Sequence, residues 1–216
     1  FYRFLRLRGY TERNPMLKMK GPKKKKPLPV FVKEQDMDKL LSKTPEADDF
    51  EGIRNHLILE TFYETGMRRA ELIGLDDKDV DTSASVIKVT GKRNKQRLIP
   101  FGEKLRKNLI AYMQLRDEVI SPRDTQAFFV NANGRRVTTQ FVYDLVKKSL
   151  SEVVTLKKRS PHVLRHTFAT SMLNHEANLE VVKELLGHKS LETTEIYTHA
   201  TFEELKQIYK QAHPRA

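Results

Sequence analysis

Hydrophobic residues return along most of this chain with the spacing of amphipathic α-helices. After Phe50, for example, Ile53, Leu57, Ile58 and Phe62 fall on one side of a helical projection. Residues 138–150 repeat the pattern, and their inward positions are expected at Phe141, Leu145 and Val146. The same spacing predicts helices over residues 33–42, 50–65 and 103–119, a short helix near residues 70–73, a helix after Ser160, one ending at Leu186 and a last one beginning at Thr201.

Between residues 86 and 100 the hydrophobic residues follow the spacing of β-strands instead of helices. Val86–Val89 and Arg97–Pro100 are predicted to form two short strands, joined through residues 90–96 as a β-hairpin with a cationic tip. A further extended, buried piece is expected at residues 128–130, before a turn at Asn133-Gly134. The predicted fold class is therefore mainly α with a small antiparallel β-sheet, an α+β arrangement.

Capping residues mark the ends of several predicted helices. Ser160 is expected to cap orphan N–H groups ahead of Pro161, which is favoured in a first helical turn. Gly66 and Gly187 each follow a helix and suit a left-handed C-terminal cap. Residues 201–204, Thr-Phe-Glu-Glu, read as a capping box that opens the last helix.

The first part of the chain differs in composition from the rest. Residues 1–10 are typical of the end of an amphipathic helix stopped by Gly9, and alone they cannot bury their aromatic side chains. Residues 11–29 contain Pro, Gly and the run Lys23–Lys26, which indicates a basic linker lying along DNA phosphates rather than a nuclear localisation signal. We expect residues 1–27 to be the end of an N-terminal domain plus its linker, and residues 28–216 to be the main domain.

Charge and composition narrow the classes of partner. The 216 residues carry a formal net charge of +12 and a sequence pI near 9.8, which favours nucleic acid or another polyanion, although a merely basic globular protein has the same balance. With no cysteine, the chain has neither disulfides nor Cys-ligated metals. No run approaches the ~18 apolar residues of a membrane span.

Four side chains near the C-terminus suggest chemistry at a phosphodiester. Arg165 can donate a bidentate pair of hydrogen bonds to phosphate oxygens, and His162 lies three residues before it on the same helix. His188 can exchange protons near neutral pH, and Tyr197 can act as a nucleophile. Further cations would be needed to meet the negative charge of the transition state. His162 and His166 are also spaced like zinc ligands, but Val163 occupies the position of a metalloprotease Glu, so we predict no metal site.

Five motifs together resemble the tyrosine recombinases, in particular the Xer-type enzymes that resolve chromosome dimers in bacteria and the related integrases of mobile elements. The resemblance covers residues 28–216 and implies the catalytic-domain fold of DNA breaking-rejoining enzymes, with residues 1–27 ending a core-binding domain. The motifs are Thr65-Gly66-Met67-Arg68 through Glu71-Leu72, Gly91-Lys92, residues 162–170 (His-Val-Leu-Arg-His-Thr-Phe-Ala-Thr), Leu186-Gly187-His188, and Ile196-Tyr197-Thr198-His199.

The resemblance implies a role for each catalytic candidate. Arg68 and Arg165 would hold the scissile phosphate, with His188 donating to a phosphate oxygen. Apart from the resemblance, Glu71 could itself be catalytic, but we expect it to orient Arg68.

Three further roles complete the implied reaction. Tyr197 would attack to give a 3′-phosphotyrosyl link, His162 would act as its acid or base, and Lys92 would protonate the departing 5′-oxygen, with Lys95 as its competitor for that role. No cofactor, metal or ATP is implied. DNA contacts are expected from cations beside these motifs, namely Arg93, Lys95, Arg97 and Lys189.

Two classes of function are carried forward. The first is a site-specific recombinase that acts as a homo- or hetero-tetramer on two double-stranded DNA sites, joined through the C-terminal helix, with an accessory DNA translocase as a further partner and the bacterial cytoplasm and nucleoid as its location. The same chemistry serves either chromosome-dimer resolution or integration of a mobile element. The second class is a DNA-binding protein of this fold that no longer cuts.

Overall fold

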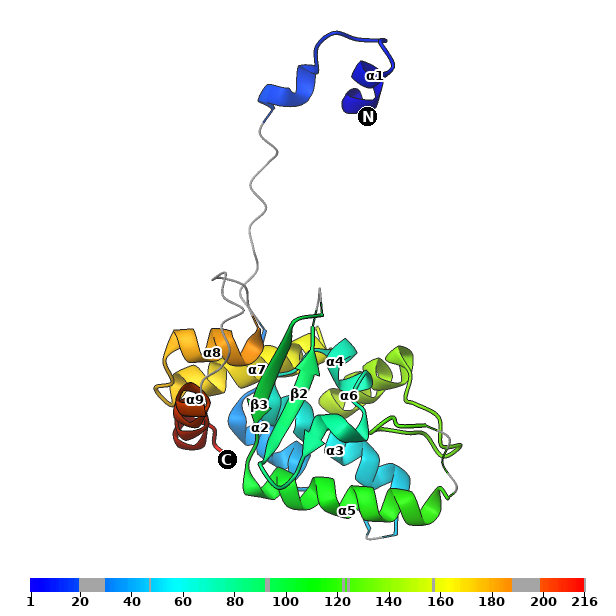
Figure 1. Ribbon diagram of the computed structural model, residues 1–216, viewed down its shortest axis with the longest axis vertical. Coiled ribbons are helices and arrows are strands. Elements are labelled where there is room, and N and C mark those ends of the chain that lie inside the picture. The colour runs from blue at the N-terminus through cyan, green and yellow to red at the C-terminus, as the bar shows by residue number, and fades with distance from the viewer. Residues whose placement is uncertain are drawn as a thin grey trace.

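The computed structural model describes residues 1–19, 30–46, 48–91, 94–121, 123, 125–156, 158–187 and 199–215 (Figure 1). The described elements are, in chain order, α1 (Tyr2–Leu7), η1 (Pro15–Lys18), α2 (Glu34–Leu41), α3 (Phe50–Thr65), α4 (Arg69–Ile73), η2 (Asp77–Asp79), β1 (Val80–Asp81), β2 (Val86–Thr90), β3 (Gln96–Pro100), α5 (Glu103–Val119), α6 (Thr139–Val153), α7 (Pro161–Asn174), α8 (Leu179–Leu186) and α9 (His199–Ala212). The predicted class, mainly helical with a small antiparallel sheet, is confirmed.

Helix α3 is the centre of the body. Its bounds agree with the prediction, and it ends at Gly66, whose φ of 58° is the expected left-handed cap. The prediction of a single apolar side was too narrow, because eleven of its 16 residues are buried, including Arg54, Glu60 and Glu64. Helices α2, α5, α6 and α7 all contact α3, so hardly any side of it faces water.

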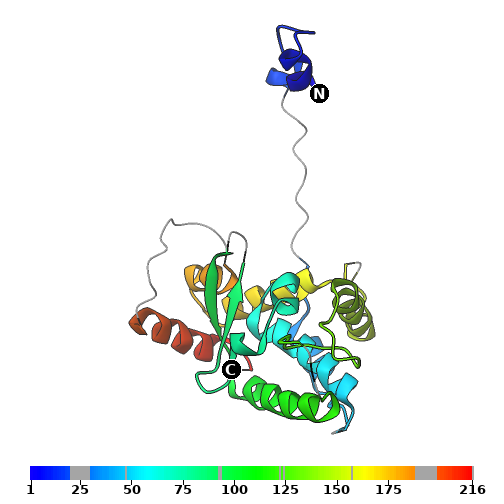
Figure 2. The ribbon, with the colours of Figure 1, turned by 45° about the vertical axis from the view of Figure 1, so that its right-hand side comes forward.

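The sheet has the antiparallel order β1-β2-β3. The β2–β3 hairpin pairs as predicted, with Ile87 opposite Ile99 and Val89 opposite Arg97. Strand β1 was not predicted, because two residues are too few to show a period. In two views the hairpin points toward the end of the body where α4, α7 and α8 meet (Figures 1 and 2).

Residues 128–130 are buried, as expected, but they do not form a strand. Val130 makes an isolated antiparallel bridge with Arg136, across the predicted turn at Gly134, whose φ is 72°. Phe128 and Phe129 instead pack edge-on with ring centroids 5.0 Å apart, beside Tyr112 of α5. Aromatic packing and single backbone hydrogen bonds to Leu75 and Val137, rather than a continuous strand ladder, therefore hold this segment.

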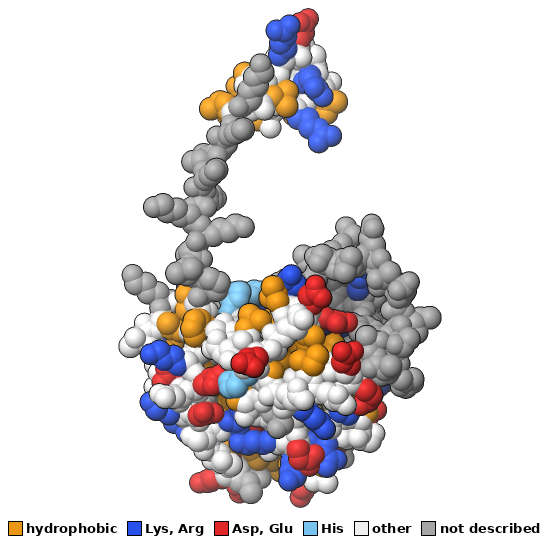
Figure 3. All heavy atoms as spheres, turned by 90° about the vertical axis from the view of Figure 1, so that its left-hand side faces the viewer, with side chains coloured by type: hydrophobic (Ala, Val, Ile, Leu, Met, Phe, Trp, Pro, Cys, Tyr) orange, Lys and Arg blue, Asp and Glu red, His pale blue; other side chains and the backbone are white. Residues whose placement is uncertain are grey.

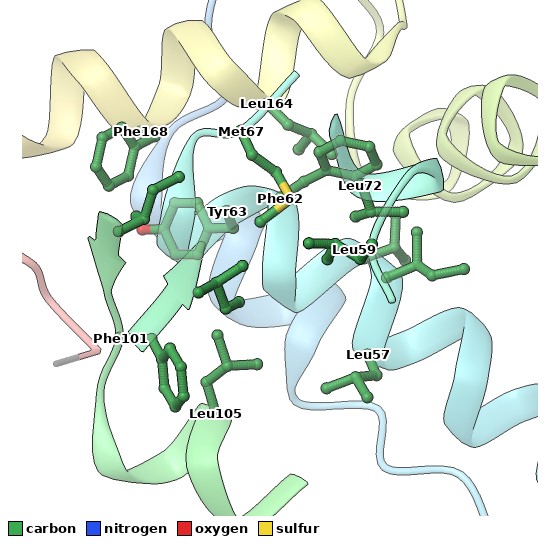
Figure 4. Packing of buried hydrophobic residues seen from close by; sticks show 14 of the residues in the cluster. Leu57, Leu59, Phe62, Tyr63, Met67, Leu72, Phe101, Leu105, Leu164 and Phe168 are labelled. Atoms are coloured by element: carbon green, nitrogen blue, oxygen red, sulfur yellow. The ribbon is translucent and has the colours of Figure 1, made fainter. Parts of the chain in front are cut away.

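Helix α7 packs its apolar side on α3 and on the residues that follow it. Leu164, Phe168 and Met172 are fully buried, and Figure 4 shows the first two pointing toward the side chains of Tyr63 and Met67. A Cβ at Gly66 would lie 2.4 Å from the Phe168 ring, so only glycine fits this contact. Ser160 is the N-cap of α7 as expected, but its side chain makes no capping hydrogen bond.

Two other expectations about helices need correction. In α6 the fully buried positions are Val142, Val146 and Leu150, whereas Phe141 and Leu145 are partly buried at its edge. Helix α9 begins at His199, two residues before the predicted capping box, so residues 201–204 lie inside it.

The C-terminal helix packs on its own body. Leu205, Tyr209 and Ala212 of α9 are buried, and the following His213 stacks on the Tyr209 ring at 5.2 Å. The Nζ of Lys206 donates to the carbonyl of Ala84 at 2.9 Å. In the described residues, α9 therefore covers the core rather than standing free of it.

Helix α1 agrees with its prediction. It ends at Leu7, one residue before its cap at Arg8, and Gly9 has a φ of 74°. None of its residues is buried, and the Phe1 and Leu7 side chains are 87% and 77% exposed.

None of the helices in the described ranges is long and apolar enough to span a bilayer.

Candidate active site

The structure describes five of the ten predicted site residues. Arg68, Arg97 and Arg165 meet around the carboxyl end of α8, His162 lies on α7 three residues before Arg165, and Lys95 follows in the β2–β3 hairpin. Predicted site residues that lie outside the described residues are Lys92, Arg93, His188, Lys189 and Tyr197.

Three consecutive carbonyl groups end α8, and each accepts a hydrogen bond from a different arginine. The acceptors are Leu185 for Arg97 Nε at 2.8 Å, Leu186 for Arg165 Nη2, and Gly187 for Arg68 Nη2 at 3.1 Å. The last carbonyls of a helix have no partners within it and carry partial negative charge. The end of α8 therefore attracts guanidinium groups, and three arginines donate hydrogen bonds to it.

Arg165 is the most deeply placed of the predicted phosphate ligands. Only 7% of it is exposed, and its Nη1 donates to the carbonyl of Gly66 at 2.7 Å. Burial and the positive charges of Arg68 and Arg97 lower the pKa of Arg165 to about 10, which leaves it charged at neutral pH. The two left-handed glycine turns, at Gly66 and Gly187, thus fix the backbone around this one side chain.

Glu71 is the carboxylate around which the arginines are arranged. Its Oε1 accepts from Arg68 Nη1 at 2.8 Å and Arg97 Nη1 at 2.9 Å, and its Oε2 accepts from the Arg68 N–H at 2.7 Å and Arg97 Nη2 at 2.9 Å. Burial alone would raise the pKa of Glu71, but Arg97 and then Arg68 lower it to about 2. Glu71 therefore contacts Arg68 as the sequence-based interpretation expected.

Arg97 occupies a position that the sequence-based interpretation did not anticipate. It was expected to contact DNA, but it is only 8% exposed and points inward from β3 toward Glu71. The strand period could have revealed this, because Arg97 pairs with the buried Val89 and alternates with the half-exposed Leu98. Its placement favours a supporting role over a DNA contact.

The root of the hairpin lies beside this cluster. The Gly91 N–H donates to the Lys95 carbonyl at 2.7 Å, and a Cβ at Gly91 would be 3.7 Å from Glu71 Oε1. The neighbouring Asn94 has a φ of 58°, which tightens the turn. Lys95 is exposed, so its charge is presented to solvent.

Two histidines extend the site along α7. His162 is exposed one turn before Arg165, and His166 is exposed one turn after His162. Partial burial, followed by the charges of His162 and Arg165, lowers the pKa of His166. His162 is thus a solvent-exposed imidazole one helical turn from the buried Arg165.

This arrangement can hold an anion. Three guanidinium groups around one carboxylate leave an excess of positive charge, and the Arg68 side chain remains 38% exposed. Arg68 and Arg165 are both planar donors that suit phosphate oxygens. Among the described residues, no group of three or more His, Asp or Glu side chains could hold a metal ion.

Comparisons with known proteins agree on one group. The profile of the phage integrase family matches residues 31–204. The tyrosine recombinase XerC of Chlorobaculum tepidum is 38% identical over 236 residues, covering 100% of this chain and 70% of the relative. The XerC of Staphylococcus carnosus is 39% identical over 216 residues, covering 100% of this chain and 72% of the relative.

Solved structures give the same result. The crystal structure of XerA recombinase is 32% identical with a TM-score of 0.66, covering 87% of this chain and 66% of that one. XerH bound to difH in a pre-cleavage complex is 28% identical with a TM-score of 0.67, covering 86% of this chain and 55% of that one. The chain thus spans between about half and two thirds of the length of these solved relatives. An integrase from mycobacterium phage Brujita, at 23% identity and a TM-score of 0.69, shares the fold.

Proposed function

This chain belongs to the phage integrase family and is a tyrosine-type site-specific recombinase, and from that premise we propose that it cuts and rejoins double-stranded DNA through a 3′-phosphotyrosyl intermediate on Tyr197. The observation that carries the proposal is the arginine cluster at the end of α8. It brings Arg68 and Arg165 together from positions 97 residues apart in the sequence. Two guanidinium groups that lie close together can donate several hydrogen bonds to the oxygens of one phosphate.

In this proposal each proton transfer during cleavage is assigned to a residue of this chain. The Tyr197 phenol oxygen attacks the phosphorus and gives its proton to His162, while the bond to the 5′-oxygen breaks and Lys92 protonates that oxygen. Arg68 and Arg165 neutralise the added charge of the transition state. The phosphate stays bonded to protein, so a second 5′-hydroxyl can displace tyrosine without ATP.

DNA recognition in this proposal uses the cations that surround the cluster. The exposed Lys95 lies on the hairpin that approaches Glu71, and Arg93 and Lys189 join it from outside the described residues. The face that carries α8 and α9 mixes hydrophobic, acidic and basic side chains (Figure 3). The related XerH structures are complexes with difH DNA.

Among biological roles, we favour chromosome-dimer resolution in the bacterial cytoplasm, on the nucleoid, with an accessory DNA translocase. The support is that XerC relatives match the full chain at 38–39% identity, whereas the transposon and phage integrase structures fall below 25% and support the fold alone. Residues 1–27 would then end a core-binding domain, and residues 28–216 would form the catalytic domain.

The active unit in this proposal is a tetramer on two DNA sites. Helix α9 would join neighbouring subunits by leaving its own body, where Leu205 and Tyr209 are now buried, and entering the same place on the next subunit. Sedimentation of the protein with its DNA site tests this. Four chains on two sites are expected, and complexes that never exceed one chain on each half-site would contradict it.

Covalent capture tests the chemistry. Nicked suicide DNA is incubated with the protein in EDTA and resolved on a denaturing gel, with Tyr197→Phe as the test variant and the exposed Tyr10→Phe as its control. Wild type and the Tyr10 variant should form an adduct, while the Tyr197 variant should bind DNA without one. Capture by the Tyr197 variant would remove it as nucleophile. No adduct from a longer chain on its own site, with binding intact, would favour the non-cutting class.

A further inference from the structure

We propose that Arg97 is a positioning residue for strand cleavage, which fixes the guanidinium of Arg68 through Glu71 and Gly187 without touching DNA. This inference rests on the proposed role of Arg68 as a phosphate ligand. It assigns a task to a buried cation that the proposed chemistry does not use.

Every nitrogen of the Arg97 guanidinium group is turned toward the protein. Nε donates to Leu185 at 2.8 Å, and the two Nη atoms donate to the two oxygens of Glu71, each at 2.9 Å. The side chain is 8% exposed, compared with 38% for Arg68. Arg97 is therefore placed to hold other groups, and Arg68 is placed to meet a ligand.

The bidentate pair fixes the plane of the Glu71 carboxylate. Each oxygen of Glu71 accepts one hydrogen bond from Arg97 and one from Arg68. Without the Arg97 fork, the carboxylate could rotate away from the two donors of Arg68. A lysine at residue 97 would keep the charge but could not form the fork.

Arg97 also packs against Gly187, whose carbonyl is the second acceptor of the Arg68 guanidinium. A Cβ at Gly187 would lie 3.1 Å from Arg97 Nη1, so the guanidinium lies directly against this turn. The Gly187 carbonyl accepts from Arg68 Nη2 at 3.1 Å. Both acceptors of the Arg68 guanidinium, Glu71 and Gly187, are thus in contact with Arg97.

Arg97 also connects elements of the fold that are far apart in the sequence. Arg97 lies on β3, Glu71 on α4 and Leu185 on α8, so one side chain ties together three elements that are far apart in sequence. Its partner in the sheet, Val89, is two residues before Gly91 at the hairpin root. Arg97 therefore fixes the position of strand β3 relative to Arg68.

The first measurement needs no cleavage. In the DNA-free protein, the NMR order parameter of the Arg68 Nε–H bond should fall clearly in Arg97→Lys and stay unchanged in Arg106→Gln. Arg106 is the matched control because it pairs with Glu103 at 2.7 Å on the surface of α5. An unchanged order parameter for Arg68 in the folded Arg97→Lys protein would overturn the proposal.

The second measurement is single-turnover cleavage of nicked suicide DNA at saturating protein. Arg97→Lys and Arg97→Gln should bind DNA within about twofold of wild type, with the same salt dependence, and cleave at least about tenfold more slowly. If Arg97 touched a phosphate, the log-log salt slope would drop by about 0.9 and the proposal would fail. Cleavage at the wild-type rate would also refute it.

A modified substrate separates positioning from general damage. A methylphosphonate at the scissile position removes one negative charge and so reduces the need for Arg68. On this DNA the defect of Arg97→Lys should shrink severalfold, as should that of Arg68→Ala, whereas a defect of equal size on both substrates would mean structural damage and overturn the positioning role. Arg68→Ala cleaving normal DNA at the wild-type rate would instead count against the proposed function, and the order parameter would still decide on Arg97.

Discussion

Glu64 offers a sharp test of the buried contacts beneath α9. Its side chain is fully buried on α3, and neither carboxyl oxygen has a hydrogen-bond partner among the described residues. The nearest cation atom is Arg215 Nε, 3.7 Å from Oε1. Burial, reinforced by the charge of Glu60, outweighs Arg215 and raises the pKa of Glu64 to about 8 from an ordinary value of 4.5.

The raised pKa makes stability depend on pH with a definite sign. Between pH 4.5 and 8 the folded protein keeps a proton on Glu64 that the unfolded chain has released. The free energy of unfolding therefore falls by about 1.4 kcal/mol per pH unit in this window, which amounts to about 3 kcal/mol at pH 7. Below pH 4.5 both states are protonated, and the cost disappears.

Glu64→Gln removes the titration while keeping the shape of the side chain. Urea unfolding of both proteins is measured at steps from pH 5 to 8, with the exposed Glu103→Gln as control. The slope of unfolding free energy against pH should be more positive in Glu64→Gln than in wild type by about 1.4 kcal/mol per pH unit. The Glu103 variant should run parallel to wild type, because the pKa of Glu103 is lowered and its titration lies below the window.

Parallel curves for wild type and Glu64→Gln across this range would refute the reasoning. They would mean that Glu64 is ionised in the folded state, and that the charge of Arg215 compensates for burial. The comparison of slopes is unaffected by any constant cost of burying the glutamine amide.

Three further predictions concern the fold and the DNA surface. Burial lowers the pKa of His213 to about 4, so stability should be lost as pH falls from 6.5 to 4, by about 3 kcal/mol, and His213→Gln should abolish that loss in urea unfolding. Gly66→Ala should cost about 2–5 kcal/mol in thermal unfolding, because its φ is positive and a Cβ would meet Phe168; Gly9→Ala, with no atom within 4 Å, should leave the main transition in place. DNA binding should weaken steeply with salt, with a log-log slope of about 0.9 for each phosphate contact, and a nearly flat titration would contradict the proposed DNA surface.

Local features of the amino-acid sequence were sufficient to predict most helices. The bounds of α3 and α5 agree with the predicted ranges, because a long apolar period and a glycine or cap residue act within a few neighbouring positions. The left-handed turns at Gly66 and Gly187 follow from the same local rules. Strand β1 was missed, since two residues show no period of their own, and residues 128–130 were expected to be buried but their partners could not be read from the sequence.

For the site, the residue types and their order were enough to indicate phosphate chemistry and to single out Arg68 and Arg165. The sequence also indicated Glu71 as the partner of Arg68, but it could not show the backbone groups that hold the arginines. Backbone carbonyls at the end of α8 leave no trace in a side-chain pattern, yet they accept hydrogen bonds from three arginines. That arrangement appears only when α4, α7, α8 and β3 are packed together.

The sequence by itself determined the helices, the basic charge, the family motifs and the candidate nucleophile, because these depend on residue identity and on spacing along the chain. Tertiary structure alone decided that Arg97 points inward to Glu71, and that Glu64 lies fully buried beside Arg215. A charged residue gives the same local signal whether it meets water or a partner. Its surroundings, and therefore its pKa and its role, are set by elements many residues away.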